Sequence, residues 1–396
     1  MPKVTYIDEV DIKDKTILLR VDFNVSLSKN KRLITDDQRI TSTLDTIKHL
    51  LKNKNRLILI SHLGRPDGHF DPKYSLQIVC DRLAEYLKDY KIRLINDFLT
   101  EKETTFKLQQ NDEIFVLENI RFYKGEKEND KKFCQNLAKL ADCFVNDAFG
   151  ACHRKDASIY GVAKYLPSYG GLLLKKEVAI LNMILTNPKK PMLAIIGGSK
   201  IDSKINLIKK IVEIADYVFI GGALSNTLLS SMGVDVKDSL YEGDKKSICE
   251  EIFKNAKYYN HEIILPVDFV CGDKDNFEKD GVICEKHNIP DKMAILDIGP
   301  KTRQLLHAYI NKCKTVVWNG PVGLFENIKY QEGTDSVFYS ISTAKHLTSV
   351  IGGGDTLSAI SKQKDLGNIT HISTGGGAML EYMEKNTLPG IDVLGR

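Results

Sequence analysis

Residues 349–359, SVIGGGDTLSA, combine residue types that can bind a phosphate and a metal ion. An apolar run ends in three glycines, and Asp355 and Thr356 then precede apolar residues at helical spacing, which predicts a strand, a glycine-rich turn and a helix. Backbone N–H groups at Gly353 and Gly354 could approach a phosphate, and the helix N-terminus adds partial positive charge. Asp355 could hold Mg²⁺ against that phosphate. A structural turn capped by Asp355 is the other interpretation that this segment alone allows.

Polar and cationic side chains follow four predicted strands in the first half of the chain. If each residue is considered alone, an arginine there is explained as a surface salt-bridge partner, and the one histidine is explained as a loop residue with satisfied hydrogen bonds. Arginines that recur after several strands instead indicate an anion, because guanidinium groups repel one another and bind carboxylate or phosphate in a bidentate manner. We therefore predict a site for a small ligand with more than one negative group. The residues are Asp22, Asn24, His62, Arg65, Arg121 and Arg154, with Arg39 in the first turn of a predicted amphipathic helix.

Glycine-rich junctions between strands and helices recur in the second half of the chain. In PMLAIIGGSKIDSKI, Lys200 and Lys204 are spaced i and i+4 after a glycine pair, on one helix face if the helix has begun there. A solvated lysine pair is the alternative for this segment. Several such turns in one domain indicate a nucleotide, yet the chain has no G-x-x-x-x-G-K-[ST] loop and no G-x-G-x-x-G fingerprint. Distributed glycine turns and lysines would therefore have to hold the phosphates.

The elements that position these residues alternate between strand and helix, which predicts an α/β fold. At 396 residues the chain suits two lobes, each a doubly wound, mostly parallel sheet flanked by helices. Prolines bracket a helical segment, so we predict a linker helix between the lobes. The predicted limits are an N-terminal domain at 1–167, the linker helix at 168–187 and a C-terminal domain at 188–385.

Composition narrows the class of protein. The formal net charge is +4, its surplus lies within the first 170 residues, and we see no basic stripe interleaved with aromatics, so nucleic acid is not an expected partner. The N-terminus lacks the apolar core of a signal peptide, and no apolar run approaches the length that crosses a bilayer, so we expect a cytoplasmic protein without a membrane partner. The eight cysteines show no metal-type spacing and are expected to be reduced. A monomer is expected, since we identify no exposed apolar stripe.

Ten motifs in order give the chain a close resemblance to the phosphoglycerate kinase family over nearly its whole length. The motifs are RVDFNV, SHLGRP, LENIRF, VNDAFGACHR, GGSKIDSKI, LPVDFV, LDIGPKT, WNGPVGLFE, GGGDT and HISTGGGA. The resemblance implies that the N-terminal lobe binds 3-phosphoglycerate, that the C-terminal lobe binds Mg-ATP or Mg-ADP, and that residues 386–396 pack back on the N-terminal lobe. Ser26, Leu224 and Ile295 depart from residues common in the family. Ile295 stands where glycine is frequent near the adenine, so the resemblance does not imply which nucleotide base the protein prefers.

The resemblance also implies residue roles. The substrate residues would be Asp22, Phe23, Asn24, Arg39, His62, Leu63, Gly64, Arg65, Arg121 and Arg154. The nucleotide residues would be Gly198, Lys200, Lys204, Gly222, Asn319, Pro321, Glu326, Gly353, Gly354, Asp355 and Thr356, with Glu326 on the ribose and Asp355 on magnesium.

The implied reaction moves a phosphoryl group between ATP and a carboxylate, reversibly and by direct in-line transfer. A carboxylate is already anionic near pH 7, so no general base is needed and catalysis must come from alignment and charge neutralisation. We expect Arg39 and Lys200 to contact the transferring group, Gly375 and Gly376 to donate backbone N–H groups to it, and the lobes to close. The alternatives are a non-catalytic nucleotide-binding protein of the same fold and, less favoured without its fingerprint, a dehydrogenase.

Overall fold

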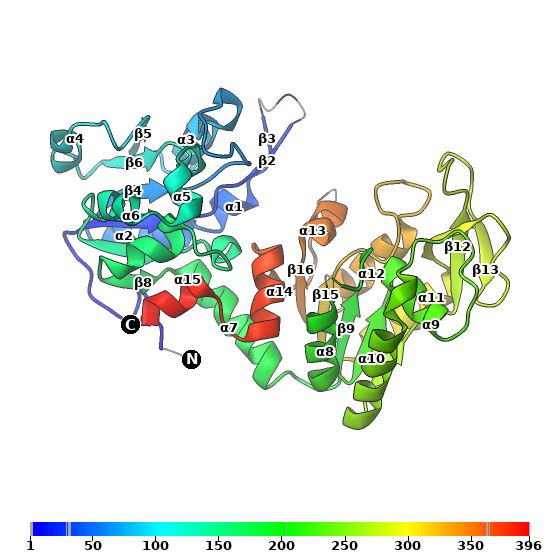
Figure 1. Cartoon of the computed structure of the whole chain (residues 1–396). Helices are drawn as coiled ribbons and strands as arrows, with labels where there is room; N and C mark the ends of the chain where they lie inside the picture. The colour runs from blue at the N-terminus through cyan, green and yellow to red at the C-terminus, as the bar shows by residue number, and fades with distance from the viewer. Residues whose placement is uncertain are drawn as a thin grey trace. The chain divides into compact units, whose positions relative to one another are not determined.

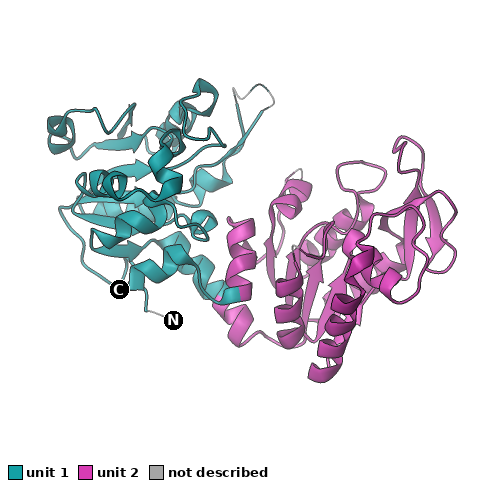
Figure 2. Ribbon diagram, in the orientation of Figure 1, with its two compact units in different colours: residues 1–181, 385–396 teal, residues 182–384 magenta. Residues whose placement is uncertain are grey.

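The computed structural model describes residues 3–28, 30, 33–202, 204–361, 363 and 365–395, which form two compact units (Figures 1 and 2). Unit 1 comprises residues 1–181 and 385–396, and unit 2 comprises residues 182–384. In unit 1, the amide of Gly390 donates to the Cys152 carbonyl oxygen at 2.8 Å, so the C-terminal segment is bonded to the N-terminal part of the chain. Arg396, the last residue of the predicted 386–396 segment, lies outside the described residues.

The predicted linker helix is present as α7 (Leu172–Thr186), but it begins four residues later than predicted. Ser168–Gly170 form strand β8 instead, because they pair in parallel with strand β7 (Cys143–Asn146). The limit between the two units falls between residues 181 and 182, inside α7.

Unit 1 is built on a six-stranded parallel sheet in the order β5-β6-β4-β1-β7-β8. All five residues of β1 are buried. Ile17 and Leu19 pack in the core with Ile47 of α2 and Leu83 of α3, while Leu18 is buried on the opposite face, as expected for a parallel sheet covered on both sides. The remaining strands are β1 (Thr16–Arg20), β4 (Arg56–Ile60), β5 (Lys91–Ile95) and β6 (Glu113–Leu117), with a separate hairpin of β2 (Ser26–Leu27) and β3 (Ile34–Asp36). The helices are α1 (Gln38–Thr41), α2 (Leu44–Lys52), α3 (Gln77–Tyr86), α4 (Glu103–Lys107), α5 (Lys124–Glu128), α6 (Lys131–Ala138) and α15 (Pro389–Asp392).

Unit 2 has its own six-stranded parallel sheet, in the order β11-β10-β9-β15-β16-β17. Counted within this sheet the order is 3-2-1-4-5-6, which places a topological switch point between β9 and β15, where open α/β sheets bind ligands. The strands are β9 (Met192–Ile196), β10 (Tyr217–Ile220), β11 (Glu262–Ile264), β15 (Thr315–Asn319), β16 (Thr348–Gly352) and β17 (His371–Ile372). The helices are α8 (Ile205–Ile214), α9 (Ala223–Ser231), α10 (Lys246–Tyr259), α11 (Pro300–Lys312), α12 (Glu332–Thr343), α13 (Gly354–Ile360) and α14 (Gly376–Lys385).

A second, antiparallel sheet in unit 2 was not predicted. It consists of β12 (Asp268–Gly272) between β13 (Val282–Glu285) and β14 (Ala294–Ile298). Strand β11 ends at Ile264 and β12 begins at Asp268, because Pro266 between them lacks the N–H needed to continue a ladder. The two-lobed α/β fold with mostly parallel sheets is confirmed. Within the described part of the chain, no helix combines the length and apolar character needed to cross a membrane.

Candidate active site

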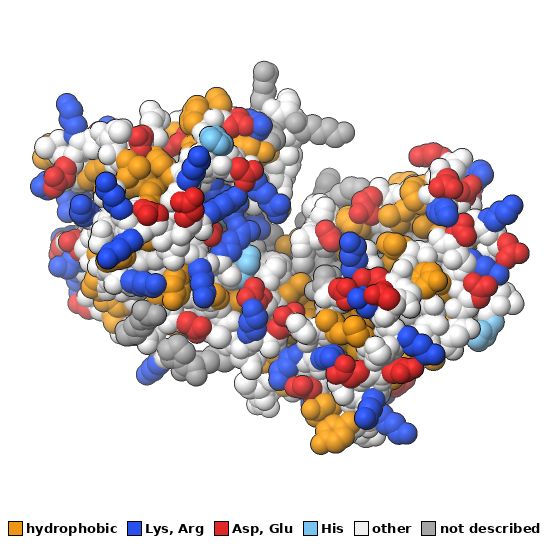
Figure 3. All heavy atoms as spheres, in the orientation of Figure 1, with side chains coloured by type: hydrophobic (Ala, Val, Ile, Leu, Met, Phe, Trp, Pro, Cys, Tyr) orange, Lys and Arg blue, Asp and Glu red, His pale blue; other side chains and the backbone are white. Residues whose placement is uncertain are grey.

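The predicted substrate residues of unit 1 lie at one edge of its sheet. Strands β6, β4, β1 and β7 are neighbours and parallel, so the segments that follow them emerge together at their carboxyl ends. These segments carry Asp22, His62, Arg121 and Arg154, and α1 adds Arg39. Figure 3 shows Lys and Arg side chains gathered over the region of α1 and α5, with a histidine beside them.

Asp22 and Arg39 form an ion pair in which the carboxylate is buried and the guanidinium is partly exposed. Burial alone would raise the pKa of Asp22, but the charges of Arg39 and Arg20 outweigh it and hold this pKa well below its usual range. The carboxylate is therefore ionised at neutral pH, and it holds Arg39 at the edge of the sheet.

His62 is buried and lies among charged groups. Its Nδ1 atom is 3.3 Å from Nη2 of Arg20 and 3.9 Å from Oδ1 of Asp22. Burial lowers the pKa of His62 to about 3; Asp22 opposes this shift, while Arg20, Arg154 and Arg39 add to it. The imidazole is therefore neutral at pH 7.

Gly64 links the ends of three strands. Its amide donates to Oδ1 of Asn24 at 2.8 Å, and its carbonyl oxygen accepts from Nη1 of Arg121 at 2.8 Å. The backbone at Gly64 has φ +63, and a Cβ there would lie 2.3 Å from the Tyr74 ring, so only glycine fits. The predicted residues Asn24, Gly64 and Arg121 are thus brought together.

Other predicted substrate residues are placed differently. The side chains of Phe23 and Leu63 are buried in the hydrophobic core, so only their backbone atoms could meet a ligand. Arg65 is exposed. Arg154 is half-buried, and its Nε lies 3.2 Å from Nε2 of His153.

Arg20 was missed as a site residue, although it contacts His62. It is the last residue of β1 and is only 1% exposed. A cation at the end of a fully buried strand is rare without a partner, and this was the available signal in the sequence.

In unit 2 the switch point brings two glycine turns and a lysine into close contact. A Cβ at Gly197 would lie 2.0 Å from the Pro321 carbonyl oxygen, and one at Gly320 would lie 2.2 Å from the Gly197 carbonyl oxygen. Lys204 Nζ donates to the Gly197 carbonyl oxygen at 2.6 Å and to Oδ1 of Asn319 at 2.8 Å. Burial lowers the pKa of Lys204 to about 8, and Asp355 opposes this shift. The turn therefore carries a half-buried cation that is mostly charged at neutral pH.

Two further glycine turns adjoin this point. Gly353 has φ +106 and precedes α13, and a Cβ at Gly376 would lie 2.7 Å from the Gly354 nitrogen, so the two turns meet backbone to backbone. Thr356 Oγ1 accepts from the Gly320 amide at 2.6 Å. The N–H of Gly375 donates to Oγ of Ser373 at 3.3 Å, whereas Gly376 is the first residue of α14, where a helix offers its own N–H no acceptor.

A cavity of about 220 Å³ in unit 2 extends from these turns into an apolar pocket. Leu240, Phe269, Ile295, Val322 and Phe325 contribute apolar walls. The predicted nucleotide residues that line the cavity are Gly198, Gly222, Pro321, Glu326 and Asp355. An apolar slot that leads to glycine turns matches the shape of a nucleotide, with a flat base followed by phosphates.

Lys200 and Lys204 would share one helix face only if a helix had begun at Lys200, and it has not. Helix α8 begins at Ile205, so Lys204 is its N-cap and Lys200 lies on the preceding segment, where it is exposed. The segment follows a turn at Gly198 with φ +128, which delays the start of the helix.

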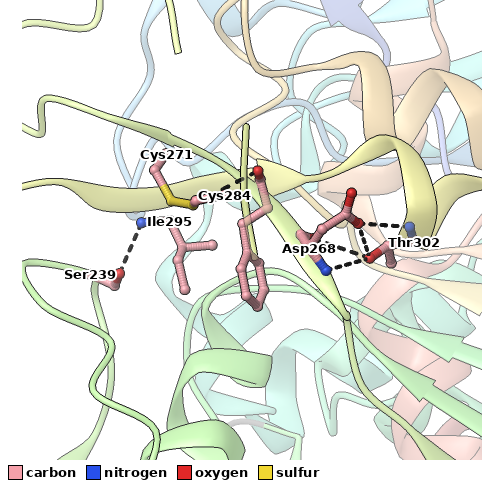
Figure 4. The surroundings of a disulfide bond; sticks show 7 residues. Ser239, Asp268, Cys271, Cys284, Ile295 and Thr302 are labelled. Atoms are coloured by element: carbon pink, nitrogen blue, oxygen red, sulfur yellow. Dashed lines mark hydrogen bonds between the residues drawn. A yellow bond between two sulfur atoms is a disulfide. The ribbon is translucent and has the colours of Figure 1, made fainter. Parts of the chain in front are cut away.

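The expectation that all eight cysteines are reduced is also wrong. Cys271 and Cys284 form a disulfide between β12 and β13, and the other six are buried thiols. The spacing of 13 residues did not reveal that the two strands pair. Figure 4 shows the bond beside Ile295, which pairs in register with Cys271 and lines the cavity.

Among the described residues, no group of three or more His, Cys, Asp or Glu side chains could hold a metal ion. Asp355 is exposed in the first turn of α13 and lines the nucleotide-shaped cavity. Mg²⁺ commonly binds through one or two carboxylates together with substrate phosphates and water, so a single carboxylate beside a phosphate site fits this ion.

Comparisons with known proteins agree over almost the whole chain. A family model described as phosphoglycerate kinase matches residues 7–386. The chain is 41% identical to the phosphoglycerate kinase of Finegoldia magna over 98% of both chains, and 43% identical to that of Thermosipho africanus over 99% of this chain and 97% of the other. The solved structure of phosphoglycerate kinase from Coxiella burnetii is similar, with a TM-score of 0.87, 34% identity and 99% of each chain covered.

Proposed function

The chain belongs to the phosphoglycerate kinase family, and we propose that its unit 1 binds the phosphoglycerate and its unit 2 the nucleotide. Its reaction is the reversible transfer of a phosphoryl group between ATP and the carboxylate of 3-phosphoglycerate, which yields 1,3-bisphosphoglycerate and ADP. The comparisons give the non-catalytic alternative no support. The observation that carries the assignment of the units is the contrast between an arginine-rich edge in unit 1 and a glycine-lined cavity in unit 2.

In unit 1, the arginines would bind the two anionic groups of 3-phosphoglycerate. Arg121 is oriented by the Gly64 carbonyl oxygen and Arg39 by Asp22. Arg65 and Arg154, which are more exposed than Arg121, would neutralise the remaining negative charge of the ligand. Guanidinium groups fixed before the ligand arrives lose little entropy on binding, which favours tight, oriented binding of a small dianion or trianion.

In unit 2, the apolar part of the cavity would take the base, Glu326 the ribose hydroxyls, and the turns at Gly198, Gly353 and Gly354 the phosphates. Lys204 adds positive charge at the switch point. The N-terminus of α13 contributes backbone N–H groups and partial positive charge to the same place.

The acceptor carboxylate needs no general base, so the chain must align the two substrates and neutralise charge on the transferring group. We assign Arg39 and Lys200 to its oxygens from side chains and Gly376 from its backbone N–H. Mg²⁺, when bound, would be held by Asp355 and would supply charge neutralisation at the nucleotide phosphates. Gly375 is a weaker candidate donor than Gly376, because its N–H already points at Ser373.

Phosphoryl transfer requires the reacting oxygen and phosphorus to come within about 3–3.5 Å of each other. Substrates held by separate units can meet this condition only when the units close over both of them, so we propose closure as a step of the reaction. Small-angle scattering should show compaction when both substrates are bound, and an unchanged radius of gyration would contradict the step.

We also propose that the protein acts as a monomer in the cytoplasm and needs Mg²⁺. Sedimentation equilibrium should give the mass of one chain, 44.6 kDa. Chelation of the divalent ion should abolish turnover, and restored turnover on addition of Mg²⁺ would confirm the requirement.

The experiment that tests the function traps the acyl phosphate with hydroxylamine. Wild-type protein with ATP, Mg²⁺ and 3-phosphoglycerate should yield hydroxamate, and Arg39→Ala should yield very little. Arg93→Met, an exposed arginine of β5, is the matched control and should behave as wild type. Absence of product while both ligands still bind would contradict the proposed function.

A further inference from the structure

Arg20 lies behind the phosphoglycerate site and is not expected to touch the substrate, yet it is among the most completely buried charged residues of unit 1. Its Nη1 group donates to the carbonyl oxygen of Val21, and to that of Ile60 at 3.4 Å. Its Nε donates to Oγ of Ser158 at 2.9 Å, and its Nη2 lies 3.3 Å from Nδ1 of His62.

The contact between Arg20 and His62 favours one arrangement of the ring, since Oδ1 of Asp22 lies 3.9 Å from Nδ1, beyond hydrogen-bond distance. A guanidinium carries donors only and stays protonated in proteins, so Nδ1 of His62 must accept. A neutral imidazole has one acceptor and one donor nitrogen, and the proton must then be on Nε2. The opposite tautomer, or the imidazolium, would set an N–H of the ring against an N–H of Arg20.

We propose that Arg20 is a positioning residue that fixes His62 as the neutral Nε2–H tautomer, so that the ring presents a hydrogen-bond donor to the phosphoglycerate. The second part of this proposal rests on the proposed function of unit 1. A neutral donor suits the site, because it binds an oxygen of the ligand without adding another positive charge to the arginines.

The guanidinium is itself held by a directed chain of hydrogen bonds. Oγ of Ser158 accepts from Arg20 and donates to Oε1 of Glu126 at 2.6 Å, while the Ser158 amide donates to Oε2 at 2.9 Å. Glu126 is buried on α5, where burial raises its pKa to about 7 and Arg20 opposes this shift, so its carboxylate carries part of a negative charge near Arg20 at neutral pH. The rotation of Arg20 is therefore fixed from the side away from His62.

The tautomer can be read directly from the intact protein by NMR of side-chain nitrogens after labelling with ¹⁵N-histidine. The His62 signals are assigned by their loss in His62→Gln. We expect the Nε2–H tautomer at pH 7 without any ligand. We expect no titration between pH 5 and 8, because burial and the charges of Arg20, Arg154 and Arg39 outweigh the opposing charge of Asp22. A protonated Nδ1 at pH 7, in either the other tautomer or the imidazolium, would overturn the proposal.

Variants separate positioning from a purely structural role. Arg20→Met removes the donors and leaves Glu126 without the nearby positive charge of Arg20, so the double variant Arg20→Met/Glu126→Gln is used to keep the buried charge balanced. In this variant we expect His62 to populate both tautomers and KM for 3-phosphoglycerate to rise about 10-fold, with a smaller change in kcat and an unchanged KM for ATP. Retention of the pure Nε2–H tautomer would overturn the positioning role.

The donor itself is tested by two substitutions of His62. The amide nitrogen of glutamine can replace Nε2, whereas asparagine reaches only the Nδ1 position, so His62→Gln should retain a lower KM than His62→Asn. Equal KM values would overturn the role of Nε2–H. The tautomer is measured without ligand, so failure of the proposed function would appear separately, as absence of 3-phosphoglycerate binding by the wild-type protein.

Discussion

The two proposed ligand sites lie at the same edge of the same kind of parallel sheet, but one is made of side chains and the other of backbone. In unit 1 the carboxyl edge of the sheet carries charged side chains. Arg39 forms an ion pair with Asp22, and Arg121 donates a hydrogen bond to the carbonyl oxygen of Gly64. In unit 2 the corresponding edge consists mainly of backbone, because glycine turns meet there around the half-buried Lys204.

The difference follows from the shapes of the two proposed ligands. A small molecule with several negative groups can be surrounded by long side chains that converge from neighbouring strands. A nucleotide is longer, and its phosphates must pass close to the backbone, where a Cβ would block them. The comparison therefore predicts that unit 1 is sensitive to loss of charge and unit 2 to added volume.

The largest effect is expected from Gly197→Ala. The new Cβ would lie 2.0 Å from the Pro321 carbonyl oxygen, and backbone on both sides cannot move aside cheaply. Overpacking typically costs about 1–3 kcal/mol, and here it would also separate the turns that surround Lys204. We expect loss of Mg-ADP binding by calorimetry and a lower Tm. Gly354→Ala is the matched control for stability, because its Cβ would have no described atom within 4 Å; an equal loss of Tm in both variants would contradict the prediction.

The next largest effect is expected from Arg39→Ala. Removal of one donor to the transition state typically lowers the rate about 10²–10³-fold. Because Asp22 would lose its counter-ion as well, KM for 3-phosphoglycerate should also rise, but by less than kcat falls. Steady-state kinetics of the variant would measure kcat and KM. Equal changes in the two would contradict a contact between Arg39 and the transition state.

The titration of Lys204 gives a pH prediction for unit 2. Its pKa is lowered to about 8 in the folded protein from the ordinary 10.5, so the unfolded chain binds the extra proton between these values. The free energy of unfolding should therefore rise with pH across this window, by up to about 3 kcal/mol from this residue. Affinity for Mg-ADP should fall as pH passes 8, since the cation is lost. Lys204→Met should abolish both trends, and trends that persist in this variant would contradict the assignment.

The smallest effect separates two arginines within unit 1. Arg121 is 5% exposed and bonded to Gly64, whereas Arg65 is exposed. Exposed ion pairs are worth about 0.2–1 kcal/mol, so Arg65→Ala should raise Kd for 3-phosphoglycerate less than 10-fold. Arg121→Ala should raise it more. If calorimetric titrations gave a larger increase in Kd for Arg65→Ala than for Arg121→Ala, the ligand would lie beside the exposed Arg65 rather than against the strand ends.

Much of this architecture could be predicted from the sequence, because buried parallel strands give continuous apolar runs and the polar residues after them share one edge. The strand ends at Asp22, His62 and Gly353 were located in this way. Burial of Phe23 and Leu63 was not recognised, since a strand-end motif does not tell which side chain turns inward.

Predictions from local sequence patterns were wrong where contacts between distant parts of the chain determine the structure. One amphipathic helix with Arg39 in its first turn was expected, but α1 and α2 are separate helices. Asp37, the N-cap residue of α1, accepts from Arg82 and Tyr86 of α3 and makes no side-chain cap. The disulfide between Cys271 and Cys284 depends on the pairing of β12 with β13, which the local sequence did not predict.

The central claim is that each unit binds its own ligand, by charge in one and by backbone in the other. Calorimetric titration of 3-phosphoglycerate and of Mg-ADP onto Arg121→Ala and onto Gly197→Ala tests it most directly. We predict that Arg121→Ala loses affinity for 3-phosphoglycerate alone and that Gly197→Ala loses affinity for Mg-ADP alone. If either folded variant lost the other ligand instead, or both ligands together, the assignment of the two sites would be contradicted.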